Sequence, residues 1–165
     1  MPQTPETVKE WLWRYKDLMD EYSRIRQRIV LLEQRARTVQ SPHLDGTPNN
    51  GTKDFDRYGV ILGQIEEMKI EAGEMLAQSK AIYAEIKVTV AKISGRDAAN
   101  RKAVILSRYL DLMPWENVTN ILFGQKYDYL DREDTYLRRT HRIHVDAITE
   151  LITILNAQEE SEGHK

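Results

Sequence analysis

Cysteine is absent from the 165-residue chain. Without cysteine the protein has no disulfide framework and no zinc site built on thiolates, and its composition fits a reducing compartment. Long hydrophobic runs are absent too, because no stretch approaches the roughly 20 apolar residues that cross a bilayer. The first residues also lack the basic-then-apolar order of a signal peptide. We therefore expect a cytoplasmic protein with no membrane contact.

The chain has no excess of positive charge, since 24 lysines and arginines are set against 26 acids and the formal net charge is −2. Domains that bind nucleic acid often have a strongly basic balance, so we expect any contact with DNA to be local. Positive residues do gather within residues 138–144, which hold three arginines and two histidines and no acid. This clustering, and not the total charge, indicates a partner.

Motifs for catalysis are also missing. The sequence contains no glycine-rich phosphate loop of the Walker or dinucleotide type, and it offers no Ser-His-Asp arrangement. His141 and His144 are three residues apart, but no third metal ligand has suitable spacing. The glutamates within residues 66–74 lack the Glu-x-x-His pairing of a di-metal bundle. We predict a protein that is not an enzyme and that uses no metal or cofactor.

Two long apolar seams dominate the first part of the chain. Apolar residues recur in each seam at alternating intervals of three and four, which keeps one side of a helix against a partner helix. Thr4 before Pro5 is a typical helix start, so the first seam predicts a helix over residues 5–39. Turn-forming residues predict a loop over 40–53, and the second seam predicts a helix over 54–93. The first seam comprises Val8, Trp11, Tyr15, Leu18, Tyr22, Ile25, Ile29, Leu32 and Ala36, and the second comprises Tyr58, Ile61, Ile65, Met68, Ala72, Met75, Ser79, Ile82, Ile86, Thr89 or Val90, and Ile93.

Two seams of similar length joined by a loop predict an antiparallel coiled-coil helical hairpin over residues 1–94. A hairpin of two helices leaves part of each apolar stripe in water. Leu12, Trp13 and Leu31 widen the first stripe beyond a strict seam, so another surface should cover it. We therefore expect the hairpin to associate with further copies of the chain and form a homo-oligomer.

A short break, Ser94-Gly95-Arg96-Asp97, predicts the boundary between two domains. The second domain, residues 95–158, should begin with a helix over about 98–112. Pro114 then starts a short helix, and a longer helix follows after a turn. Residues 159–165 are acidic and are expected to form a disordered tail.

The short helix that Gly124 ends and the long helix after it look like a helix-turn-helix. In that motif the first helix braces the second, and the second enters the major groove of DNA. We predict that the core of the motif contains Trp115, Val118, Leu122, Leu137 and His141, the last as a partly buried side chain with a hydrogen bond. We predict that DNA is contacted by Thr135, Arg138, Arg139, Arg142 and, just before the long helix, Arg132. The predicted fold is therefore all-α, with an N-terminal coiled-coil hairpin and a C-terminal helix-turn-helix domain.

Three stretches of the sequence resemble one known family. They are the loop Ser41-Pro42-His43-Leu44-Asp45-Gly46-Thr47-Pro48, the pair Arg108-Tyr109-Leu110 and Trp115-Glu116-Asn117-Val118, and the helix Leu137-Arg138-Arg139-Thr140-His141 with Ala147-Ile148. Together they resemble phage-encoded late transcription regulators of the ArpU and RinA type, whose C-terminal part is similar to sigma factor region 4. The resemblance implies an activator of late phage genes that contacts promoter DNA in a bacterial host, alongside host RNA polymerase. One departure is the turn over residues 125–134, which is longer than the few residues usual in the family.

Two alternatives remain open at this point. The first is a small subunit of a phage DNA-packaging machine, which would recognise phage DNA and assemble into a ring through its coiled coil. A ring of many subunits would favour packaging, whereas a dimer would favour a regulator on a two-fold operator. The second is an adaptor without DNA binding, whose apolar seams capture partner helices.

Overall fold

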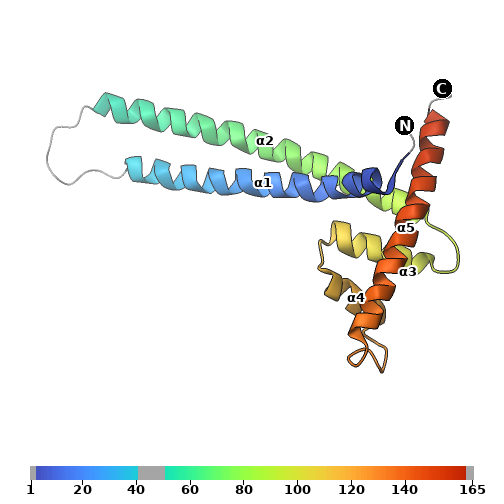
Figure 1. Ribbon diagram of the computed structural model, residues 1–165. Coiled ribbons are helices and arrows are strands. Elements are labelled where there is room, and N and C mark those ends of the chain that lie inside the picture. Colours follow the sequence, from blue (N-terminus) through green and yellow to red (C-terminus); the bar gives the residue numbers. More distant parts are fainter. Residues whose placement is uncertain (1–2, 41–50, 163–165) are drawn as a thin grey trace. The chain divides into compact units, whose positions relative to one another are not determined.

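The computed structural model describes residues 3–40 and 51–162 (Figure 1). Within these two ranges every regular element is a helix and no strand occurs, so the predicted all-α class is confirmed. The Ser41–Pro48 connector, which contributes to the family resemblance, lies outside the described residues.

The helices begin and end close to where the sequence predicts. The Thr4 hydroxyl accepts a hydrogen bond of 3.3 Å from the Thr7 amide, so Thr4 caps the first helix as expected. The second helix starts three residues earlier than the predicted residue 54. The elements are α1 (Pro5–Gln40), α2 (Gly51–Ala91), α3 (Ala98–Ile105), the π-helical turn η1 (Leu106–Leu110), α4 (Trp115–Phe123) and α5 (Glu133–Glu162).

The chain divides into two compact units, and the division differs from the predicted boundary at residues 94–95. One unit, called here the composite unit, contains residues 3–17 and 80–162, and the other, the helix-pair unit, contains residues 18–40 and 51–79. The first turns of α1 and the last turns of α2 belong to the composite unit because their apolar residues share one core with the later helices. A helical seam shows which side of a helix is buried, but it does not show against which element.

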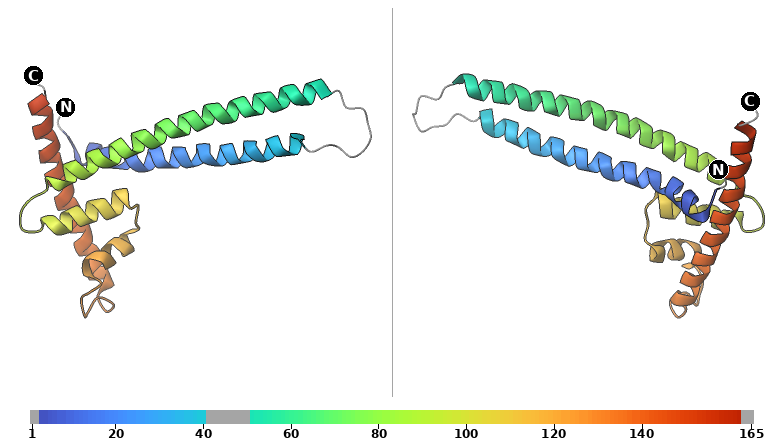
Figure 2. Two further views of the ribbon diagram at one scale, coloured as in Figure 1. Left: turned by 180° about the vertical axis from the view of Figure 1, so that it is seen from behind. Right: turned by 45° about the horizontal axis from the view of Figure 1, so that its top comes forward.

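The helix-pair unit consists of the remaining parts of α1 and α2, which lie side by side and run in opposite directions (Figure 2). Its core contains Ile29, Ala36, Ile61, Ile65 and Ala72, all of them members of the predicted seams. Every seam residue along both helices is buried or half-buried. At the rim of this core the Lys69 ammonium lies 2.9 Å from the Glu33 carboxylate and holds the pKa of Glu33 below its usual value.

The composite unit is built around α5, against which α3 and α4 pack. Its core brings together Val8, Leu12, Ile86, Ile105 and Leu151, which come from four different helices. Burial of these side chains is the main favourable term in its stability.

The end of α5 differs from the prediction, because residues 159–162 continue the helix where an acidic disordered tail is expected. The cause is a tertiary contact with the start of the chain. The Gln3 amide donates to Asn156 Oδ1 at 2.9 Å, and the Gln3 side chain donates to Glu159 at 2.5 Å.

The helix predicted over residues 98–112 is shorter and changes type within it. After α3 the backbone widens into η1, where the Asp111 amide donates to the Leu106 carbonyl, five residues earlier, at 3.0 Å. Leu112 then has a φ of 55°, which ends the helix, and its side chain is exposed and not on the buried face. Sequence periodicity does not reveal this change because the apolar positions before it fit an α-helix equally well.

We expect Leu12→Ala to lower the free energy of unfolding by about 2–5 kcal/mol, because Leu12 is fully buried in the composite core and its truncation leaves a cavity. Leu130→Ala removes the same atoms from a side chain that is 83% exposed, and it should change the free energy by less than about 0.5 kcal/mol. Urea unfolding followed by circular dichroism measures both. Equal effects of the two substitutions would show that Leu12 is not in a core.

Candidate nucleic-acid interface

Helix α4 packs against the first half of α5 through side chains from both helices. The Thr119 hydroxyl lies 3.0 Å from the Thr140 hydroxyl, and both threonines are buried. Next to this pair the rings of Phe123 and Tyr136 have centroids 5.0 Å apart. These contacts give α5 a fixed position on α4, as a bracing helix must provide.

An aromatic cluster joins α4 and α5 to η1 and α1. It consists of Trp13, Arg108, Tyr109, Trp115 and His144. The Arg108 guanidinium lies between two indole rings, 5.3 Å from the Trp13 centroid and 5.0 Å from the Trp115 centroid. Such a cation over aromatic faces is attracted by the ring quadrupoles. Arg108 also donates to the Met113 carbonyl at 2.8 Å, so it holds the segment between η1 and α4 as well.

At the buried end of this cluster, the Tyr109 hydroxyl and His144 Nε2 form a hydrogen bond of 2.9 Å. Burial is the main cause that lowers the pKa of His144 from 6.5 to about 4, and the nearby positive charges of Lys9, His141 and Arg108 add to it. Burial also raises the pKa of Tyr109 to about 12. Both side chains are therefore neutral at physiological pH, and this pair serves packing.

The five residues predicted to form the core differ in how deeply they are buried. Val118 is buried, and Trp115, Leu122 and Leu137 are half-buried. The prediction of a partly buried His141 is wrong, because its side chain is exposed. Its ring is tilted by 54° to the Trp115 ring, with the centroids 4.5 Å apart.

The side of α5 that faces α4 contains polar residues, and two of them, Tyr136 and Thr140, were not predicted from the sequence. Tyr136, Thr140 and His144 follow one another at intervals of four, and Thr140 takes the place expected of His141. The hydrogen-bonded histidine is thus His144 and not His141. An apolar pattern does not identify buried threonines and tyrosines, because their hydroxyls are buried only where the folded chain supplies a hydrogen-bond partner.

Three of the predicted DNA-contacting residues lie together on the exposed side of α5. Thr135, Arg138 and Arg142 recur at intervals of three and four, and all three are exposed. This side, called here the cationic face, is opposite the side that carries Thr140 and His144. It is therefore separate from every contact that braces the helix.

The other two predicted arginines are exposed but already engaged within the protein. The Arg139 guanidinium lies 5.1 Å from the centroid of the Phe123 ring, on the flank of α5 next to α4. Arg132 donates to the Asp128 carboxylate at 3.3 Å. Neither arginine shares the cationic face, so the structure groups three of the five predicted residues and sets two apart.

The long turn between α4 and α5 is held by its own hydrogen bonds. The Tyr136 hydroxyl donates to Asp128 at 2.7 Å and, with Arg132, holds the pKa of that carboxyl below its usual value. Tyr129 also lies against Tyr136, with ring centroids 5.8 Å apart. The long turn is thus held by Asp128, which pairs with Arg132 and accepts a hydrogen bond from Tyr136.

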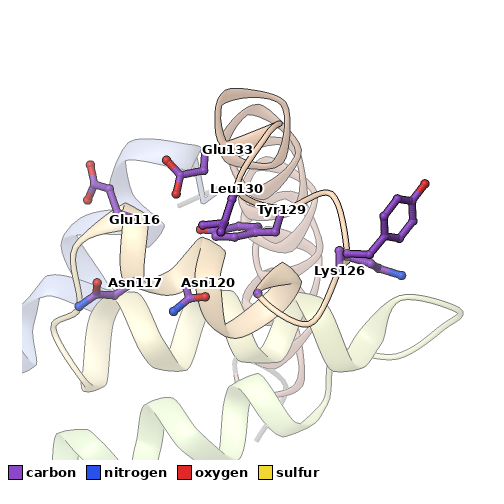
Figure 3. A pocket seen from close by; sticks show the side chains of 9 residues that line it. Glu116, Asn117, Asn120, Lys126, Tyr129, Leu130 and Glu133 are labelled. Carbon is purple, nitrogen blue, oxygen red and sulfur yellow. The ribbon is translucent and has the colours of Figure 1, made fainter.

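A pocket lies between α4 and this turn (Figure 3). Its lining includes the carboxylates Glu116 and Glu133, together with Asn117, Asn120 and Leu130. Carboxylates here would repel a phosphate backbone. Glu133 is on the α4-facing side of α5, so this acidic region does not overlap the cationic face.

Comparison with known proteins found no match, either among family models, among curated proteins or among solved structures. In the part of the chain that the structure describes, no helix is both long and apolar enough to cross a membrane. The same residues contain no group of three histidines or acids able to hold a metal ion. A function must therefore be argued from the geometry of the side chains.

We expect acid to destabilise the protein through His144. The unfolded chain takes up this proton near pH 6.5 and the folded chain near pH 4, so the unfolded state binds more protons between these values. The free energy of unfolding should fall by roughly 3 kcal/mol as the pH is lowered from 6.5 to about 4, at about 1.4 kcal/mol for each pKa unit. Urea unfolding at a series of pH values measures this loss.

His144→Gln should remove this part of the pH dependence. The matched variant His141→Gln changes an exposed imidazole that touches the same Trp115 ring. It should keep most of the loss, because burial contributes more than the charge of His141 to the lowered pKa of His144. Carboxylates such as Asp128 titrate equally in both variants, so the difference between them isolates His144. An unchanged slope in His144→Gln would contradict the assignment.

Proposed function

We propose that this protein is a DNA-binding transcription regulator. In this proposal residues 115–162 act as a helix-turn-helix in which α4 braces α5 and α5 reads DNA. The observation that carries it is the two-sided character of α5: one side is fixed by α4 and η1, and the opposite side exposes Thr135, Arg138 and Arg142. A recognition helix needs such a separation, because the groups that hold it cannot also contact bases.

The chemistry of the cationic face suits duplex DNA. An α-helix fits the major groove, where arginine can pair with guanine through two hydrogen bonds and threonine can bond to either base or phosphate. Arg138 and Arg142 are four residues apart and thus one turn apart along the groove. Arg139 and Arg132 lie outside this face, and we assign them to packing of the motif.

Acidic residues limit the length of α5 that is proposed to contact DNA. Asp134 precedes Arg138 by four residues and Asp146 follows Arg142 by four, so each end of the cationic face is bordered by a carboxylate. Phosphate should therefore be accepted between these acids and repelled beyond them. This arrangement agrees with a local contact in a chain whose net charge is −2.

The transcriptional role rests on the resemblance to ArpU-type and RinA-type regulators, part of which falls on Arg108-Tyr109 and Trp115. These residues belong to the aromatic cluster that positions α4 and α5. Promoter DNA of late phage genes and host RNA polymerase are the partners that the resemblance adds to this proposal. The residues before α3 are proposed to form a coiled-coil hairpin.

We expect Arg138→Ala and Arg142→Ala each to weaken binding to a preferred duplex by roughly 1–3 kcal/mol where the arginine contacts a base. The preferred sequence is first selected from a random duplex pool with the unmodified protein. Fluorescence anisotropy with that duplex and with a scrambled one, over a series of salt concentrations, then separates specific from purely electrostatic binding.

Arg96→Ala is the matched control, since Arg96 is an exposed arginine of the composite unit far along the chain from α5. Its affinity should equal that of the unmodified protein. The proposal fails if Arg138→Ala and Arg142→Ala both bind as the control does, with circular dichroism showing all three folded.

A further inference from the structure

The helix-pair unit exposes apolar side chains that its own core does not use. On α1 Leu31 is 64% exposed, and on α2 Ile70 is 65% exposed. Because α1 and α2 pack on each other through their seams, the side of each helix opposite its seam points away from the other helix. We call these sides the outer faces of α1 and α2.

The two outer faces differ in shape. The outer face of α1 comprises Ser23, Gln27, Val30, Leu31 and Gln34, and a shallow groove runs along it beside Val30 and Leu31. The outer face of α2 comprises Gly59, Gly63, Ile70 and Ala77, with the exposed Glu67 and Glu74 between them. A Cβ added at Gly59 or Gly63 would meet nothing within 4 Å, so packing inside this unit does not require glycine there. Glycine weakens a helix relative to alanine, but it allows another helix to approach closely.

The two outer faces also differ in charge. The outer face of α1 is bordered by five exposed arginines, Arg24, Arg26, Arg28, Arg35 and Arg37. The outer face of α2 itself carries Glu67 and Glu74 and is flanked by Glu66 and Glu71, and all four glutamates are exposed. Some charges have the opposite sign. They are Asp20 and Glu21 on α1, Arg57 near the start of α2, and Glu33 and Lys69, which pair with each other inside the unit. Residues that border a helix–helix seam set the choice of partner through such opposite charges.

We propose that the outer face of α1 is complementary to the outer face of α2 on a second copy of this chain. The larger side chains Val30 and Leu31 of one copy pack against the glycine and alanine positions of the next, and the arginines around the α1 face meet the glutamates on and beside the α2 face. This contact is between unlike faces. The proposal goes beyond DNA binding and uses none of the residues assigned to it.

Contacts between unlike faces have a consequence for assembly. The two faces lie on opposite sides of the helix pair, so a pair of copies still offers one unused face at each end. Association of this kind continues until it closes into a ring or extends as an open chain. Assembly beyond a dimer would shift the biological role from a regulator toward a packaging subunit, while contact of α5 with DNA belongs to both.

The test measures the mass of the full-length protein by size-exclusion chromatography with light scattering. We expect the unmodified chain to form assemblies larger than a dimer, which shrink as salt screens the charged borders. Leu31→Asp and Ile70→Asp should each give monomers, since a carboxylate placed in an apolar contact weakens association by more than about tenfold. Leu130→Asp alters an exposed leucine of the α4–α5 turn and should leave the assembly unchanged.

Mixing the two monomeric variants gives the decisive result. The Leu31→Asp chain keeps an intact α2 face and the Ile70→Asp chain an intact α1 face, so the mixture should form one-to-one pairs and nothing larger. Gly63→Ala should weaken assembly while raising the thermal midpoint of the dissociated protein. The proposal is overturned if the unmodified chain is a monomer, if only one of the two Asp variants dissociates, or if the mixture stays monomeric. Duplex binding by α5 is measured separately, so either proposal can fail alone.

Discussion

The position of Arg108 between Trp13 and Trp115 is the interaction on which the composite unit depends. It joins α1, η1 and α4, and through Trp115 and Tyr109 it reaches His144 on α5. A guanidinium suits this place because it remains charged while its flat faces stack on aromatic rings. Among the described residues, no buried polar side-chain atom lacks a hydrogen-bond partner, so the polar members of the cluster are placed without an unpaired group.

From this cluster the orientation of α5 follows. His144 and Thr140 are both held on the inner side, by Tyr109 and by Thr119. A helix fixed at two successive turns cannot rotate about its axis, so Arg138 and Arg142 are directed outward without making contacts of their own. The proposed DNA contact is thus a consequence of buried, uncharged hydrogen bonds on the other side of the same helix. In the helix-pair unit, by contrast, arginines predominate around the outer face of α1 and glutamates on and beside the outer face of α2.

Much of the fold could be predicted because the periodic spacing of apolar residues identifies long helices. The seams through Ile29 and Ile65 indicate the buried sides of α1 and α2, and the bounds of both helices lie within a few residues of the predicted ones. The candidate site was predicted less well. Arg138 and Arg142 occupy the exposed side as expected, but His141 is exposed, and the buried histidine with a hydrogen bond is His144. Thr140 and His141 are adjacent in sequence, and only one of them can face α4. The apolar pattern of α5 cannot show which one is buried, because threonine and histidine interrupt it.

The sequence by itself determined the all-α class, the two seams and the gathering of arginines on the last helix, because each of these depends on residues near one another in the chain. Only the tertiary structure decided which elements share a core. In the folded chain residues 3–17 belong to the same compact unit as residues 80–162, and the helix changes to the π-helical turn η1 after Ile105. Arg139 contacts the Phe123 ring and is not part of the cationic face. These outcomes depend on contacts between residues far apart in sequence, where packing and hydrogen-bond partners outweigh local preference.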